Sequence, residues 1–331
     1  MSDLRAGLIG LGMMGRNHAR VLASTEGIDL VGVADPLGDQ YDAARSATVY
    51  NDPMALIDSG IDLCVVAAPT EDHERLGLAL ADAGVHAMVE KPLAMTTDAA
   101  QALVDAFEDA GLVGAVGHIE RFNPALRQLR RRLDAGDLGE LYQISTIRCG
   151  PFPGRIRDVG VIKDLATHDV DLTAWVAGSP FTSISAQTAH KSGRAHEDLV
   201  AATGMLGNGV VTSHQVNWLS PMKQRQTVVT GERGAFVADT LTGDLTYYEN
   251  GEIETTWEAV SAFRGVSEGN VTRFAFAKQE PLATEHEAFR DAVLGDGGDI
   301  VTMRQGMAAV AVAEAMLKSA SNDGASVRLP S

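Results

Sequence analysis

Residues 6–15 read Ala6-Gly7-Leu8-Ile9-Gly10-Leu11-Gly12-Met13-Met14-Gly15, an apolar run that ends in glycines spaced G-x-G-x-x-G. The apolar residues predict a buried β-strand, and the sequence after Gly15 predicts a helix. At such a strand–turn–helix junction, bare glycine backbone lets a pyrophosphate approach the N-terminus of the helix. The segment therefore predicts a dinucleotide-binding loop with the cofactor-binding residues Gly10, Gly12, Met13, Met14 and Gly15.

A second predicted strand, residues 28–34, ends at Asp35, about 20 positions after Gly15. A carboxylate at this place accepts hydrogen bonds from the ribose hydroxyls of NAD and repels the 2′-phosphate of NADP. The next residues, Pro36-Leu37-Gly38, include no Arg or Lys that could neutralise such a phosphate. We therefore expect NAD in preference to NADP, although an aspartate after a strand can also be an ordinary turn residue.

The hydrophobic pattern divides the chain into two domains. Strand-like and helix-like segments alternate over residues 1–122, which predicts an α/β Rossmann domain with a doubly wound parallel sheet. After Asn123-Pro124, strand-like segments follow one another with turns such as Gly207-Asn208-Gly209 between them. We expect an α+β domain over residues 123–331, with an open, mainly antiparallel sheet for substrate binding and oligomerisation. Its final helix, within residues 302–319, could pack back on the first domain.

Composition excludes several classes of function. The 331 residues carry a formal net charge of −17, which argues against a nucleic-acid-binding surface but leaves room for a local phosphate site. No apolar run approaches the ~20 residues that span a bilayer, and no export signal is recognisable. We expect a cytoplasmic protein without nucleic-acid or membrane partners. Cys64 and Cys149 lie in strand-like segments, which favours buried thiols over a disulfide or metal site.

Two further loops follow predicted parallel strands and are candidates for the cofactor site. Pro69, Thr70 and His73 come after the strand of residues 61–67, and Glu90-Lys91-Pro92 comes after the strand of residues 85–89. The proline favours an extended conformation at Lys91, whose ammonium could then reach the cleft. A lysine before a proline turn can equally be an ordinary surface residue.

A predicted helix over residues 164–176 carries a possible acid–base pair. Asp164 and His168 are four positions apart, so both side chains lie on one face of this helix. They could act as a base with its electrostatic partner, or as a helix N-terminal carboxylate beside a structural histidine. Spacing alone leaves both interpretations open.

The glycine loop, the Glu90-Lys91-Pro92 segment and the helix with Asp164 and His168 together resemble the glucose–fructose oxidoreductase, inositol dehydrogenase and rhizopine-catabolism (Gfo/Idh/MocA) family of NAD(P)-dependent sugar oxidoreductases. The resemblance covers essentially the whole chain. It implies that Lys91, His168 and Asp164 form the catalytic group, with Lys91 stabilising the developing alkoxide and Asp164 supporting the pair. His168 is suited to act as the base, although either it or Lys91 could move the proton. No metal is required.

Two segments, residues 117–124 and 150–162, resemble a narrower branch that oxidises C3 of UDP-N-acetylglucosamine. Many inositol- and hexose-acting members instead have a more basic, asparagine-containing segment where Ile119-Glu120 stand. The narrower resemblance implies the substrate-binding residues Lys91, Arg121, Asn123, Arg155, Arg157, Asp164 and His168. Arg155 and Arg157 could bind a diphosphate bidentately, or could pair with nearby carboxylates.

The sequence therefore predicts an NAD-dependent dehydrogenase that oxidises a secondary alcohol of a sugar, in the first place a nucleotide sugar. An inositol or free-sugar dehydrogenase is the alternative within enzymes. A non-catalytic, dinucleotide-dependent sensor is the alternative from another class, and the presence of Lys91, Asp164 and His168 argues against it. An open sheet leaves a face to be covered, so we expect a homo-oligomer formed through the second domain.

Overall fold

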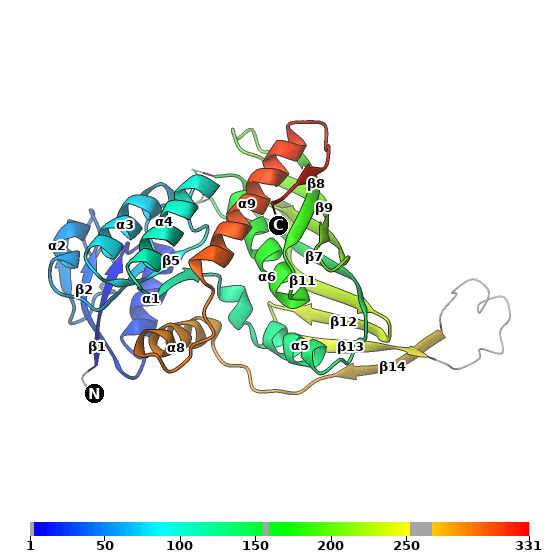
Figure 1. Cartoon of the computed structure of the whole chain (residues 1–331), viewed down its shortest axis with the longest axis horizontal. Helices are drawn as coiled ribbons and strands as arrows, with labels where there is room; N and C mark the ends of the chain where they lie inside the picture. Colours follow the sequence, from blue (N-terminus) through cyan, green and yellow to red (C-terminus); the bar gives the residue numbers. More distant parts are fainter. Residues whose placement is uncertain (1–2, 155–158, 252–266, 331) are drawn as a thin grey trace. The chain divides into compact units, whose positions relative to one another are not determined.

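The structure, a computed structural model, describes residues 3–154, 159–251 and 267–330 (Figure 1). The chain forms two compact units. The first comprises residues 1–119 and 280–314, and the second comprises residues 120–279 and 315–331. The first unit is thus made of two stretches of chain, one from each end of the sequence. Among the described residues, no helix has the length and apolar content needed to cross a membrane.

The first unit contains a six-stranded parallel sheet in the order β3-β2-β1-β4-β5-β6. Its strands are β1 (Leu4–Ile9), β2 (Ile28–Ala34), β3 (Thr48–Tyr50), β4 (Leu63–Val66), β5 (His86–Glu90) and β6 (Gly114–Gly117). The central strands are buried on both faces, as the continuous apolar runs in their sequences predict. The strand order reverses between β1 and β4, and ligands of such sheets bind at the carboxyl ends of the strands beside this reversal. The predicted Rossmann architecture is confirmed.

Helices enclose the sheet of the first unit. They are α1 (Met13–Leu22), α2 (Pro53–Ile57), α3 (His73–Asp82), α4 (Thr97–Asp109), α8 (Pro281–Leu294) and the first part of α9 (Met303–Ala320), with the short 3-10 helix η1 (Thr70–Asp72). Phe289 of α8 is fully buried in one apolar cluster with Leu8 and Leu30 of the sheet. Glu314 of α9 accepts hydrogen bonds from the hydroxyl and the backbone N–H of Thr97 at 2.6 and 3.3 Å. The returning segment therefore supplies core residues as well as surface contacts.

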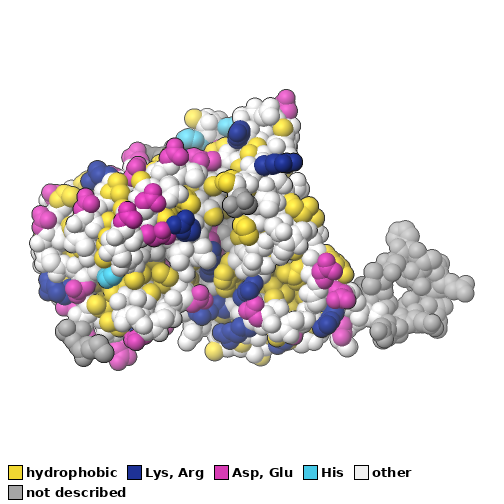
Figure 2. Space-filling view, in the orientation of Figure 1, with side chains coloured by type: hydrophobic (Ala, Val, Ile, Leu, Met, Phe, Trp, Pro, Cys, Tyr) yellow, Lys and Arg dark blue, Asp and Glu magenta, His cyan; other side chains and the backbone are white. Residues whose placement is uncertain are grey.

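Acidic side chains dominate one part of the surface of the first unit. Figure 2 shows Asp and Glu side chains spread over the face that α3 and α4 form in the orientation of Figure 1. These groups contribute to the net charge of −17.

Cys64 is a buried free thiol within β4, and burial raises its pKa above the ordinary value.

The second unit contains a nine-stranded sheet in the order β14-β13-β12-β11-β7-β10-β9-β8-β15. Its strands are β7 (Leu141–Pro151), β8 (Phe181–Ala189), β9 (Leu199–Leu206), β10 (Val211–Asn217), β11 (Leu219–Gly231), β12 (Gly234–Asp239), β13 (Asp244–Gly251), β14 (Ser267–Arg273) and β15 (Val327–Arg328). All neighbouring strands are antiparallel except the parallel pair β7 and β10. The predicted open, mainly antiparallel sheet is confirmed.

Helices α5 (Pro124–Asp134) and α6 (Thr167–Ala177) pack against one face of this sheet (Figure 1). Asn123 caps α5, because its side-chain oxygen accepts the backbone N–H of Ala125 at 3.0 Å. The 3-10 helix η2 (Ile119–Phe122) precedes α5. The sequence pattern predicted one continuous helix from Asp164, whereas the structure has a π-helical turn, η3 (Ile162–Ala166), before α6 begins.

Candidate active site

The glycine loop joins β1 to α1, and its glycines serve two purposes. A methyl group on Gly10, whose φ is +93°, would lie 2.6 Å from the carbonyl oxygen of Ala67. A methyl group on Gly15 would lie 1.9 Å from the carbonyl oxygen of Gly10. At Gly12, no heavy atom of the described residues comes within 4 Å of that position. Gly10 and Gly15 thus permit the tight turn, and Gly12 leaves bare backbone open to a ligand.

The N-terminus of α1 is built to receive an anion. Gly12 is its N-cap residue, no side chain of the described residues caps the helix, and its first turn carries no acidic residue. The backbone N–H groups at a helix start, together with the helix dipole, attract phosphate oxygens. Met13 is 52% exposed beside this opening. The loop therefore fits the pyrophosphate of a dinucleotide.

Asp35 is held at the end of β2 by two backbone groups. Its Oδ2 accepts the N–H of Leu11 in the glycine loop at 2.8 Å, and its Oδ1 accepts the N–H of Leu37 at 2.9 Å. These bonds give Asp35 a structural role and also fix its orientation. Each carboxylate oxygen can accept more than one hydrogen bond, so the ribose hydroxyls can still be bound. Near this loop the guanidinium of Arg16 stacks 3.9 Å from the ring centre of Tyr41, a contact that the sequence did not predict.

The loops after β4 and β5 are joined by a buried histidine. His73 Nδ1 lies 3.0 Å from the carbonyl oxygen of Pro92, and its Nε2 lies 3.0 Å from that of Ala68. Burial lowers the pKa of His73, although the two carbonyls and the charge of Glu90 act in the opposite direction. Pro69 is exposed and Thr70 half-buried at the start of η1. His73 thus holds the two loops together, while Pro69 and Thr70 remain accessible.

Glu90, the last residue of β5, is buried between α1 and the backbone of its own loop. Its Oε1 lies 2.9 Å from His18 Nε2, and its Oε2 accepts the backbone N–H of Lys91 at 3.0 Å. The following Lys91–Pro92 peptide bond is cis. Lys91 itself is half-buried. Within the first unit the structure thus brings the glycine loop, Asp35 and the loops of Pro69 and Lys91 to the carboxyl ends of neighbouring strands.

In the second unit, the segment that carries Asp164 is fixed by Glu197 from the loop before β9. Glu197 Oε1 accepts the N–H of Ile162 at 3.0 Å, and its carbonyl oxygen accepts the N–H of Val161 at 3.0 Å. A methyl group on Gly160 would lie 2.1 Å from the Glu197 carboxyl group. Asp164 is buried on the π-helical turn that begins here, and π-helical turns occur frequently at functional sites.

His168 lies on the first turn of α6, which a buried ion-pair chain anchors to β7. Arg148 donates to Asp169, the neighbour of His168, at 2.8 Å and to Glu120 at 2.7 Å. Burial alone would lower the pKa of Arg148, but the two carboxylates raise it above its ordinary value. His168 is half-buried. The structure therefore brings Asp164 and His168 onto adjacent turns, each with its own anchor.

Two other predicted substrate-binding residues have internal partners. Arg121 forms a buried bidentate ion pair with Asp171, at 2.8 and 2.6 Å. Asn123, besides capping α5, donates to the carbonyl oxygen of Thr240 at 3.0 Å. Their contact with substrate stays a prediction. Arg155 and Arg157 lie outside the described residues.

Both units are similar in sequence to known proteins. Residues 4–118 match a family model described as an oxidoreductase family with an NAD-binding Rossmann fold, and residues 126–237 match the GFO/IDH/MocA C-terminal domain. Inositol 2-dehydrogenase 2 of Saccharopolyspora erythraea is 30% identical, over 96% of this chain and 93% of its own length. This chain belongs to the Gfo/Idh/MocA family. It is therefore an NAD-dependent dehydrogenase of sugars or polyols.

A second curated relative and two solved structures are also similar to this chain. UDP-N-acetylglucosamine 3-dehydrogenase of Acidithiobacillus ferrooxidans is 30% identical, over 88% of this chain and 90% of its own length. Its solved structure covers 96% of this chain and 98% of its own, with a TM-score of 0.83 and 27% identity. GenD2 from gentamicin A biosynthesis, solved in complex with NAD, covers 100% and 97%, with a TM-score of 0.83 and 25% identity. The inositol and UDP-N-acetylglucosamine relatives are named dehydrogenases, which disfavours the non-catalytic sensor.

Proposed function

We propose that this dehydrogenase oxidises C3 of a nucleotide sugar of the UDP-N-acetylglucosamine type. The observation that carries the proposal is the ion-pair chain from Glu120 through Arg148 to Asp169. These ion pairs connect the acidic residue at position 120 to the first turns of α6. Many inositol- and hexose-acting members instead have a basic segment at that position. The similarity to UDP-N-acetylglucosamine 3-dehydrogenase over most of both chains supports the same branch.

In the proposed mechanism, the glycine loop and Asp35 hold NAD, which supplies the hydride acceptor. Lys91 donates a hydrogen bond to the substrate hydroxyl and stabilises the negative charge that develops on its oxygen. His168 takes the hydroxyl proton, the general-base role that histidine side chains commonly fill. Asp164, one turn earlier, favours the protonated imidazole through its negative charge.

We assign Arg155 and Arg157 a role in binding the nucleotide part of the substrate. Both precede the π-helical turn in the sequence, and paired guanidinium groups bind phosphate oxygens bidentately. We infer that they contact the diphosphate of the nucleotide sugar. A free sugar or an inositol lacks that group, so these arginines would contribute little to its binding.

An inositol dehydrogenase is the second candidate, because inositol 2-dehydrogenase 2 matches this chain over nearly its whole length at 30% identity. The deciding experiment measures NADH formation from NAD with UDP-N-acetylglucosamine, other UDP-sugars, inositols and free hexoses. We expect the highest kcat/KM with a UDP-sugar, and a loss of at least tenfold when Arg155 and Arg157 are both changed to Gln. A higher kcat/KM with an inositol would refute the nucleotide-sugar proposal.

We also infer that the protein is a homo-oligomer formed through the face of the nine-stranded sheet opposite α5 and α6, which the described residues leave uncovered. Met205 and Val211 are 39% and 42% exposed and pair across β9 and β10 on this face. Ile147 and Val228 on neighbouring strands are half-buried there, although helices cover the opposite face of the sheet. An apolar face of this kind favours association with a second copy. A cytoplasmic location stays a prediction from the sequence.

A further inference from the structure

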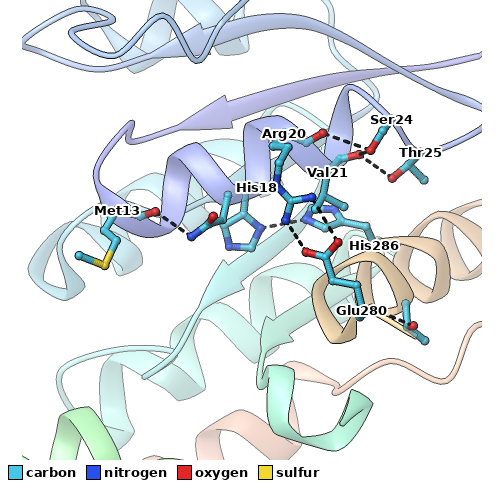
Figure 3. Close-up of polar contacts among 10 residues, drawn as sticks. Met13, His18, Arg20, Val21, Ser24, Thr25, Glu280 and His286 are labelled. Carbon is cyan, nitrogen blue, oxygen red and sulfur yellow. Dashed lines mark hydrogen bonds and ion pairs between the residues drawn. The ribbon is translucent and has the colours of Figure 1, made fainter. Parts of the chain in front are cut away.

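A buried hydrogen-bonded chain in the first unit ends at the backbone of Lys91. His286 Nε2 of α8 lies 2.9 Å from His18 Nδ1 of α1, and His18 Nε2 lies 2.9 Å from Glu90 Oε1. The other oxygen of Glu90 accepts the backbone N–H of Lys91 at 3.0 Å. Figure 3 shows His18 and His286 facing each other where α1 and α8 meet. Both imidazole rings are fully buried, and Glu90 is only 7% exposed.

The protonation states of Glu90, His18 and His286 follow from the groups that surround them. Burial alone would raise the pKa of Glu90, but the hydrogen bond and charge of His18, together with the charge and backbone N–H of Lys91, hold it below the ordinary value. Glu90 is therefore a carboxylate at neutral pH and can only accept hydrogen bonds. His18 Nε2 must carry the hydrogen that faces it. Burial and the charge of His18 hold the pKa of His286 well below its ordinary value, so the His286 ring is neutral.

A buried carboxylate stays in place only while its oxygens are satisfied. An apolar residue at position 18 would remove the donor to Glu90 Oε1. The carboxylate would then have to turn or take up a proton, and in either case its bond to the Lys91 N–H weakens. The Lys91 N–H then loses its acceptor, and with it a restraint on the backbone that orients the lysine side chain.

We propose that His18 is a positioning residue for Lys91, with Glu90 as the link and His286 as a second support. The inference rests on the proposed function in taking Lys91 as the group that binds the substrate hydroxyl. Neither His18 nor Glu90 takes part in proton transfer. Helix α8 thereby acts on the reaction through two histidines, although it lies far from Lys91 in the sequence.

The protein has a matched control for this proposal in an ion pair between the same two helices, α1 and α8. Arg20, on α1, forms an ion pair with Glu280, the N-cap residue of α8, and both side chains are exposed (Figure 3). Arg20→Gln breaks a contact between α1 and α8 without touching the buried chain. Effects shared by the Arg20 and His18 variants therefore report helix packing. Effects confined to His18 variants report the link to Lys91.

The first test needs no sugar substrate. Hydrogen–deuterium exchange at the Lys91 amide is followed in the NAD-bound enzyme and its variants by mass spectrometry of overlapping peptides. We expect exchange at least about tenfold faster in His18→Leu, as for the loss of one buried hydrogen bond. His18→Gln keeps an N–H donor and should stay within about threefold of wild type, as should Arg20→Gln. Equal rates in His18→Leu and Arg20→Gln would overturn the inference.

The second test measures kcat and KM with the sugar that gives the fastest NADH formation. We expect His18→Leu to lower kcat by about 10- to 100-fold with the KM for NAD within about twofold, because only the hydroxyl-binding group is misplaced. His18→Gln should restore most of the turnover. If His18→Leu does not fold, His286→Leu removes the second support and should lower kcat by about threefold to tenfold.

The Lys91→Ala variant tests the catalytic role of Lys91 separately from the positioning role of His18. Wild-type turnover in Lys91→Ala would remove Lys91 from the proposed mechanism, whatever the His18 variants do. If Lys91→Ala is inactive while His18→Leu turns over like Arg20→Gln, the mechanism stands and the positioning role of His18 is refuted.

Discussion

The carboxyl group of Glu197 lies so close to Gly160 that a methyl group on residue 160 would overlap it. This contact sets where the segment bearing Asp164 begins, because Glu197 also accepts the N–H of Ile162. A side chain at position 160 must displace the carboxylate and release the start of the helix. The start of the helical segment that bears Asp164 therefore depends on a glycine outside it.

The first prediction is that Gly160→Ala destabilises the second unit by about 1–3 kcal/mol, the usual cost of overpacking, and lowers kcat. Urea unfolding and NADH formation measure the two effects. Gly150→Ala is the matched control, since a methyl group there would meet Lys223 only at an ordinary contact distance of 3.7 Å. Equal stability of the two variants would show that Glu197 moves aside freely.

The second prediction concerns the proposed catalytic group. Lys91→Ala and His168→Ala should each lower kcat by about 10²- to 10⁴-fold, the range for loss of an acid–base or charge-stabilising group. NAD affinity, followed by fluorescence titration, should change little in His168→Ala. Asp164→Asn should lower kcat less, because it supports His168 without touching the proton. Wild-type turnover in either alanine variant would contradict the assignment.

A third prediction addresses cofactor choice. Asp35→Ser combined with Leu37→Arg removes the carboxylate and adds a cation at a position that is 74% exposed. The ratio of kcat/KM for NADP to that for NAD should rise at least about tenfold, since a 2′-phosphate gains a partner and loses a repulsion. Leu37→Arg alone is the control and should change the ratio less. Because Asp35 also holds Leu11 and Leu37, NAD use should fall as well.

Acid should weaken the second unit through His214, which is the basis of the fourth prediction. Burial lowers the pKa of His214 to about 4, while its Nδ1 stays 2.9 Å from Thr146 Oγ1. As pH falls from about 6.5 to 4, the unfolded chain binds a proton that the folded chain does not, so stability falls by roughly 3 kcal/mol. His214→Asn should lack this part of the decline in urea unfolding between pH 7 and 4. Parallel curves for the two proteins would exclude it.

The last prediction tests the sheet face. Met205→Lys combined with Val211→Glu places charge on adjacent strands of the uncovered face. We expect the oligomer to dissociate, as judged by sedimentation velocity, because desolvating charged side chains opposes association. Val271→Lys, at an exposed position of the edge strand β14, is the control and should leave the assembly unchanged. A wild-type protein that sediments as a monomer would refute the proposal directly.

Local signals in the sequence were enough for much of the fold. The strand–glycine–helix pattern of residues 4–22 and the alternating segments after it predicted the parallel sheet, because strand and helix periods are set by neighbouring residues. The π-helical turn around Asp164 was not predictable in this way. It depends on Glu197, which accepts the N–H of Ile162 from a position 35 residues away in the sequence, so no local pattern indicates it.

The buried contacts among His286, His18 and Glu90 could not be predicted from the sequence for the same reason. His18 lies in one helical stripe with Val21 and Leu22, which marks it as a core-facing histidine. Its partners, however, are 72 and 268 residues away in the sequence, and no local pattern connects them. Glu90, predicted to bind the cofactor, proved to have both oxygens engaged inside the first unit.

The return of the chain to its first unit has a consequence for biosynthesis. Phe289 and His286 complete the core and the polar chain beside β1 and α1, yet they are translated long after these two elements. The first unit therefore stays unfinished in the growing chain while residues 120–279 are synthesised. An N-terminal fragment that stops at residue 122 lacks these residues, so we expect it to expose this gap and to aggregate.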